Sequence, residues 1–115
     1  MNPITPRIGT VFVPVSDVEA ARDWYCRLLG VPADGEILFG HLYVLPVEGT
    51  GLVLDSRIYS RDAVFKVPAF HLDTQDVQAA HAYAVELGAD PAAIQYGQWF
   101  NFRDPDGNAL MVCQC

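Results

Sequence analysis

Two related stretches of sequence decide the fold: SDVEAARDWYCRL at residues 16–28 and QDVQAAHAYAVEL at residues 75–87. At a constant offset an aspartate, a valine, two alanines and a leucine are identical, and Trp24 matches Tyr83 as an aromatic residue. Each stretch is amphipathic, has an acidic residue at its start and is followed by a glycine, which is the pattern of an α-helix. Ser16 and Glu19 match a capping box at the start of the first helix. An internal repeat of this kind indicates a chain built from two similar halves.

Short β-strand patterns flank both helices, with one strand before each helix and three after it. The turn DPDGN at residues 104–108 has the proline and glycine of a tight hairpin. The expected fold is α+β: one domain made of two tandem βαβββ modules, at about residues 7–58 and 65–115, with an eight-stranded mixed sheet curved into a cup and the helices outside. The expected strands lie at residues 8–15, 37–39, 42–45, 52–54, 67–74, 92–94, 99–103 and 109–113.

Composition narrows the class of protein. The chain has 115 residues, of which 51% are hydrophobic, and a net charge of −7. It can therefore fill the core of one domain, while its negative charge disfavours nucleic acid as a partner. Its apolar runs are too short to cross a membrane, and its first residues lack the pattern of an export signal, so we expect a cytoplasmic protein. An odd cysteine count argues against a disulfide framework, so Cys26, Cys113 and Cys115 are expected to be reduced thiols.

The pattern resembles the vicinal oxygen chelate superfamily, which includes glyoxalase I, extradiol dioxygenases and bleomycin-binding resistance proteins. The resemblance rests on residues 8–25, on Leu28-Leu29-Gly30 and on FRDPDGN at residues 102–108, and it spans essentially the whole chain. It implies a cup that holds a ligand, and a homodimer. Because enzymes and plain binding proteins share this fold, the resemblance implies no single reaction.

Enzymes of that superfamily hold a divalent metal with histidine, glutamate or glutamine side chains from equivalent strands of both halves. The resemblance places three of these positions on Thr10, Ala69 and Met111, and the fourth near Asp55. Threonine, alanine and methionine are poor ligands for the usual divalent ions, so no metal cofactor is expected at the usual site.

A metal at other positions remains a second possibility. His71 and Asp73 share one face of a strand, because alternate side chains point the same way. His41 would complete a set of two histidines and one carboxylate.

Strand alternation from Thr10 and Met111 predicts which side chains face the cup. The predicted lining mixes flat aromatic surface with a few polar groups, as in pockets for organic ligands, and Arg103 suits an anionic substituent. No catalytic residue can be named from the pattern. The predicted ligand-binding residues are Thr10, Phe12, Tyr43, His71, Asp73, Trp99, Asn101, Arg103, Met111 and Cys113.

Three functions are consistent with these residues. The favoured one is a metal-independent protein that binds a small, partly aromatic organic molecule, in the manner of the bleomycin-binding proteins. The alternative is a metal-dependent lyase or dioxygenase that uses His41, His71, Asp55 or Asp73 as ligands. In the third, the chain's own side chains fill the cup and the protein serves assembly.

Overall fold

The computed structural model describes residues 2–115, and these contain two helices and six strands. The elements are β1 (Thr10–Pro14), α1 (Val18–Leu29), β2 (Leu42–Val44), β3 (Gly51–Asp55), β4 (His71–Asp73), α2 (Val77–Glu86), β5 (Trp99–Arg103) and β6 (Ala109–Cys113). The strands form two three-stranded sheets, in the orders β1-β3-β2 and β4-β6-β5. In each sheet one outer strand runs parallel to the central strand and the other runs antiparallel to it. The two halves therefore share one topology, as the repeat predicted.

The eight-stranded cup predicted from the sequence is wrong in strand number, because the short strands expected at 37–39 and 92–94 do not form. Only two isolated bridges remain there, Leu38 with Leu42 and Gln95 with Trp99. Each bridge closes a tight turn whose two central residues, Phe39-Gly40 and Tyr96-Gly97, have positive φ angles. Such turns match the twist of a hairpin.

The chain before each of these turns leaves the ladder early. In the first half it bends beneath the ring of Tyr43, whose hydroxyl oxygen accepts a hydrogen bond from the Gly35 N–H at 3.3 Å. A Cβ at Gly35 would lie 2.7 Å from that oxygen, so only glycine fits this approach. In the second half the Ala92 N–H donates to the Asn101 carbonyl of β5 at 2.8 Å. The preceding residue, Pro91, has no N–H and cannot add a further hydrogen bond to β5.

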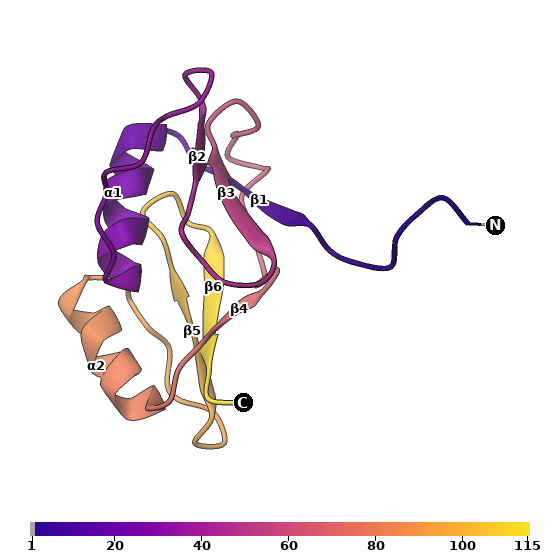
Figure 1. Ribbon diagram of the computed structural model, residues 1–115. Helices are drawn as coiled ribbons and strands as arrows, with labels where there is room; N and C mark the ends of the chain where they lie inside the picture. Colours follow the sequence, from indigo (N-terminus) through magenta and orange to yellow (C-terminus); the bar gives the residue numbers. More distant parts are fainter. Residues whose placement is uncertain (1) are drawn as a thin grey trace.

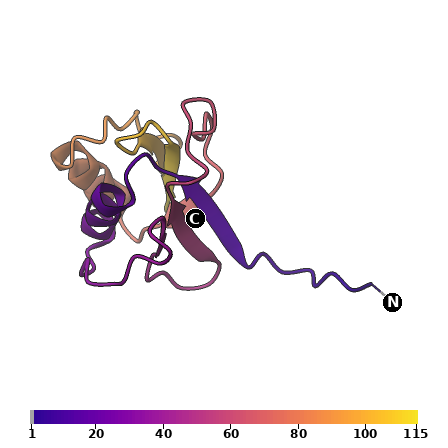
Figure 2. The same cartoon turned by 90° about the horizontal axis from the view of Figure 1, so that it is seen from above.

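Both helices cover the same side of the sheets, and the core lies between the two layers (Figure 1). Val13, Leu54, Phe100 and Leu110 are fully buried there. The opposite face of each sheet has no helix over it within the described chain (Figure 2). The segment that precedes β1 projects away from the body of the molecule in both views.

The aspartates shared by the two repeats cap the two helices. Asp17 Oδ1 accepts hydrogen bonds from the N–H groups of Glu19 and Ala20, and Asp76 Oδ1 accepts one from Ala79. The predicted capping box is therefore wrong by one residue. Ser16 instead donates through its hydroxyl to Asp106 Oδ1 at 2.6 Å, in the other half of the chain.

A buried polar cluster joins the two halves through the DPDGN turn. Tyr25 of α1 donates its hydroxyl proton to Asp104 Oδ2 at 2.5 Å. Asn108 donates through Nδ2 to the Pro14 carbonyl and to Asp104 Oδ2, each at 2.8 Å, and its Oδ1 accepts from the Phe65 N–H at 2.9 Å. Burial, followed by the charge of Asp104, raises the pKa of Tyr25 well above its usual value, so the phenol remains a donor.

The two C-terminal cysteines contradict the expectation of three reduced thiols. Cys113 and Cys115 are joined as a disulfide, while Cys26 is free and buried. The Cα atoms of the bonded pair are 5.3 Å apart, within the range that a disulfide spans. The chain leaves the strand after Cys113, which brings two alternate residues close enough to bond.

Replacing Tyr25 by phenylalanine should lower the free energy of unfolding by about 2 kcal/mol, because it removes a buried hydrogen bond to a charged acceptor. Urea denaturation measures the loss. Tyr96→Phe removes a hydroxyl from an exposed hairpin tip and should change stability by less than about 0.5 kcal/mol. Equal effects of the two substitutions would contradict a joining role for the cluster.

Candidate functional site

The candidate site is the face of each sheet that points away from the helices. Val11, Val13 and Leu54 point toward the helical layer and pack in or against the core. The alternate residues of these strands point away from the helices. Among them, Phe12 of β1 is 50% exposed and Val44 of β2 is 53% exposed. We call these two surfaces the open faces of the first sheet (β1, β2, β3) and of the second sheet (β4, β5, β6).

Cross-strand pairing arranges the open face of the second sheet in three rows. This face is mostly polar or polarizable, with one flat aromatic ring. Going across the sheet, the rows are Asp73, Cys113 and Trp99, then His71, Met111 and Asn101, then Ala109 and Arg103.

The open face of the first sheet has the same arrangement and a different chemistry. Its central row is entirely apolar, whereas the matching row of the second sheet contains an imidazole and an amide. The rows are Pro14, Asp55 and Leu42, then Phe12, Val53 and Val44, then Thr10 and Gly51.

These registers place the residues predicted to bind a ligand. By strand register nine of the ten lie on the side of the open faces, Thr10 and Phe12 on the first sheet and the other seven on the second, but Cys113 is only 3% exposed. Tyr43 does not: it is 2% exposed and points into the core, where its hydroxyl contacts Cys26 and Gly35. The side chain of Tyr43 follows the helix-facing alternation of β2, whose register the sequence specified only weakly.

A groove of about 440 Å³ lies over the open face of the second sheet. Asn101, Arg103 and Ala109 form its floor. One wall is the segment 66–68, which passes the start of β6, and the other is the segment 90–92, which runs beside β5. Sequence reasoning missed Lys66, because it lies in the connection between the halves and belongs to no motif.

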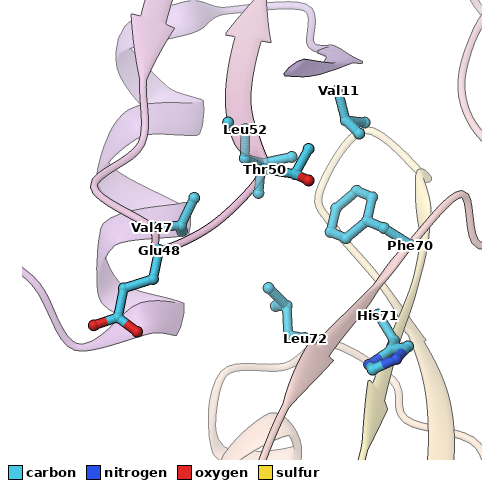
Figure 3. A pocket seen from close by; sticks show the side chains of 9 residues that line it. Val11, Val47, Glu48, Thr50, Leu52, Phe70, His71 and Leu72 are labelled. Carbon is cyan, nitrogen blue, oxygen red and sulfur yellow. The ribbon is translucent and has the colours of Figure 1, made fainter. Parts of the chain in front are cut away.

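A second, smaller cleft of about 170 Å³ separates the two halves (Figure 3). Val11 and Leu52 enter it from the first sheet, and Phe70 and Leu72 enter it from the segment that leads into and forms β4. The carboxylate of Glu48 and the ring of His71 point away from this apolar centre in Figure 3. The centre of the cleft is therefore apolar and offers no charged side chain to an ion.

Two histidine–carboxylate pairs lie near the open faces, one in each half. His41 Nδ1 is 2.9 Å from Asp55 Oδ1, and His71 Nδ1 is 3.3 Å from Asp73 Oδ1. Burial alone would raise the pKa of Asp55, but hydrogen bonds and charges from His41 and Arg57 outweigh it and lower that pKa below its usual value. Within residues 2–115, no three histidine, cysteine, aspartate or glutamate side chains are placed to share one metal ion.

The positions at which the resemblance expects metal ligands do not fit a divalent ion. Thr10 and Met111 lie on open faces, and Ala69 precedes β4. The residue of the first sheet that corresponds to Met111 is Val53, because it occupies the same place in the central strand. None of these four side chains offers an imidazole or a carboxylate.

The free energy of unfolding should fall at low pH, because Asp55 stabilises the fold only while its carboxylate is ionised. Its pKa is lower in the folded state than in the unfolded state, so the carboxylate stabilises the fold above its ordinary pKa, and this contribution is lost as the pH falls through the folded pKa. Asp55→Asn should be destabilised near pH 7 and approach the parent protein at low pH, as followed by urea denaturation across a pH series. Asp62→Asn, at an exposed position, is the control, and a constant difference for Asp55→Asn at all pH values would contradict the assignment.

Comparison with known proteins agrees with this architecture. The family model of the Glyoxalase/Bleomycin resistance protein/Dioxygenase superfamily matches residues 7–112. The fold and its paired open faces define a protein of the glyoxalase-like class. This chain belongs to the Glyoxalase/Bleomycin resistance protein/Dioxygenase superfamily.

Solved structures show the same fold with different activities. The antibiotic-binding protein TnmS3 from Streptomyces sp. CB03234 is 28% identical, with a TM-score of 0.70, and the match covers 98% of each chain. A glyoxalase/bleomycin resistance protein from the same strain is 29% identical, with a TM-score of 0.65, over 93% of this chain and 99% of that one. Lactoylglutathione lyase from Agrobacterium tumefaciens is 19% identical, with a TM-score of 0.71 and coverage of 97% and 95%, and this similarity shows the fold alone.

Among curated proteins, none matches the chain. Neither helix of the described residues has the length and apolar character needed to cross a bilayer.

Proposed function

We propose that this chain is a cytoplasmic protein that binds a small, partly aromatic organic molecule on its open faces without a divalent metal. The observation that carries the proposal is the contrast between the two faces, one apolar around Phe12 and Val53, the other polar around Asn101 and Arg103. A ligand with one aromatic side and one polar side suits such a pair of surfaces. The similarity to an antibiotic-binding protein at 28% identity supports binding rather than turnover.

Homodimer formation is part of this proposal. Phe12 and Val44 expose apolar surface on the open face of the first sheet, on either side of Val53 in one cross-strand row. Large apolar side chains gathered on one surface favour a protein partner. A second copy of the chain would cover them and would bring the apolar face of one copy near the polar face of the other.

The dimer predicts a mass of twice 12.7 kDa in sedimentation equilibrium or light scattering. Phe12→Glu places a charge within the apolar face and should shift the population toward monomer. Tyr96→Glu, which adds the same charge at an exposed hairpin tip, is the control and should leave the mass unchanged. A parent protein that stays monomeric at millimolar concentration would overturn this part of the proposal.

Thermal unfolding tests binding and the metal-dependent alternative together. A ligand that binds only the folded state raises the unfolding temperature, by about 10 °C at a hundredfold excess over its dissociation constant. We expect 2-naphthol, a neutral aromatic probe, to raise this temperature. In chelator-treated protein, Ni²⁺, Zn²⁺, Mn²⁺, Fe²⁺ and Mg²⁺ should leave it unchanged. A large shift with one of these metals that is lost in His71→Ala would favour a metal-dependent lyase or dioxygenase instead.

A further inference from the structure

The disulfide between Cys113 and Cys115 closes a loop around a single residue, Gln114. A disulfide stabilises a fold mainly by restricting the unfolded chain, and this restriction grows with the length of the closed loop. A loop of one intervening residue therefore adds little to the stability of the whole domain. Any effect of this bond on the structure is local.

The two bonded cysteines differ in their access to solvent. Cys113 ends β6 and is 3% exposed, in the cross-strand row between Asp73 and Trp99. Cys115 lies beyond the strand and is exposed. A thiolate in solution can therefore reach the disulfide at Cys115 and not at Cys113. Exposed disulfides are the ones that small thiols reduce readily.

Gln114 connects the disulfide loop to two other parts of the second half. Its N–H donates to the Gln98 carbonyl at 2.7 Å, in the hairpin that leads into β5. Its Oε1 atom accepts a hydrogen bond from the Val77 N–H at 2.9 Å. Val77 is the first residue of α2, where backbone N–H groups have no acceptor within the helix. The disulfide thus holds in place a side chain that caps α2.

The third cysteine is not placed to open this bond. Cys26 is 1% exposed and packs in the core, where its sulfur contacts the Tyr43 hydroxyl. It is the remaining cysteine of the chain. Opening the disulfide therefore requires thiols from solution, which supply the two electrons.

We infer that Cys115 is a site of reversible modification by a low-molecular-weight thiol such as glutathione, and that the reaction releases Gln114 from α2. The thiolate of one glutathione attacks Cys115 Sγ and forms a mixed disulfide. The electron pair of the broken bond goes to Cys113 Sγ, which takes up a proton. A second glutathione attacks the glutathione sulfur of the mixed disulfide, so oxidised glutathione leaves and Cys115 becomes a thiol. The inference goes beyond the proposed function and does not depend on the ligand of the open faces.

Reduction in the native state is the first test. The protein is oxidised with oxidised glutathione, incubated with millimolar reduced glutathione, quenched in acid and alkylated in denaturant, and mass spectrometry identifies the labelled cysteines. We expect labelling to extend from Cys26 alone to all three cysteines, and to return to Cys26 alone when oxidised glutathione is restored. A bond that reduced glutathione opens only in urea would overturn the inference.

Two matched variants test which sulfur reacts. With oxidised glutathione, Cys113→Ser should form a mixed disulfide at Cys115. Cys115→Ser should stay unmodified, because the cysteine that it keeps is buried. Cys26→Ala is the control and should open and close its disulfide like the parent protein. Equal uptake of glutathione by Cys113→Ser and Cys115→Ser would overturn the assignment of Cys115.

Amide hydrogen exchange tests the release of Gln114. Reduction should speed exchange of the Val77 N–H about tenfold, because this group loses its acceptor. The Ala20 N–H, which Asp17 caps in the first half, is the internal control and should not change. Gln114→Ala should speed exchange at Val77 in the oxidised protein as well and remove the difference between the two states. Equal exchange at Val77 in the oxidised and reduced parent protein would overturn the link to α2.

Discussion

The structure depends on the buried hydrogen bonds around Asp104 and Asn108. Strand pairing holds each half together, but within residues 2–115 no strand of one sheet pairs with a strand of the other, so side chains make the contacts between the halves. Asn108 is fully buried and reaches the end of β1, the segment before β4 and the β5–β6 turn. Because these polar groups are buried, removing one of them would leave its partners without a hydrogen bond. The cluster thereby sets how the two open faces are oriented relative to each other.

The two halves keep one backbone and have acquired different surfaces. Their helices are capped by equivalent aspartates, and their hairpins close with an aromatic residue and a glycine, both at positive φ. The open faces have diverged, since Val44 occupies the place in the first sheet that Asn101 occupies in the second. Duplication thus supplied two copies of a rigid frame, and substitutions on alternate positions of its strands made one copy apolar and the other polar. An amphipathic ligand needs both kinds of surface, which is why the difference bears on function.

The acidic and basic side chains of the molecule have different surroundings. The chain as a whole is acidic, and several of its acids serve as helix caps, turn residues or partners of nearby side chains. Asp104 accepts hydrogen bonds from backbone N–H groups, Asn108 and Tyr25, which stabilise its carboxylate within the structure. The cations of the groove, Lys66 and Arg103, are instead oriented by carbonyl oxygens. A local positive site can therefore exist within a protein of negative net charge. Dissolved salt screens the repulsion between distant charges, so the charges in direct contact with an anion decide whether it binds.

The sequence by itself determined the repeat, the helices and the alternation of the strands. These follow from local periodicity. Alternation from Thr10 and Met111 and the observed registers place Phe12, His71, Trp99, Asn101 and Arg103 on the same side of their strands, and their role in binding stays a prediction. Tertiary structure decided the rest. It moved the cap from Ser16 to Asp17, because Ser16 bonds to the distant Asp106, and it buried Tyr43 against Cys26 in the core. It also reduced two expected strands to single bridges. Only the folded chain places Lys66 and Arg103 in the lining of one groove, since the walls of the groove come from segments far apart in the sequence.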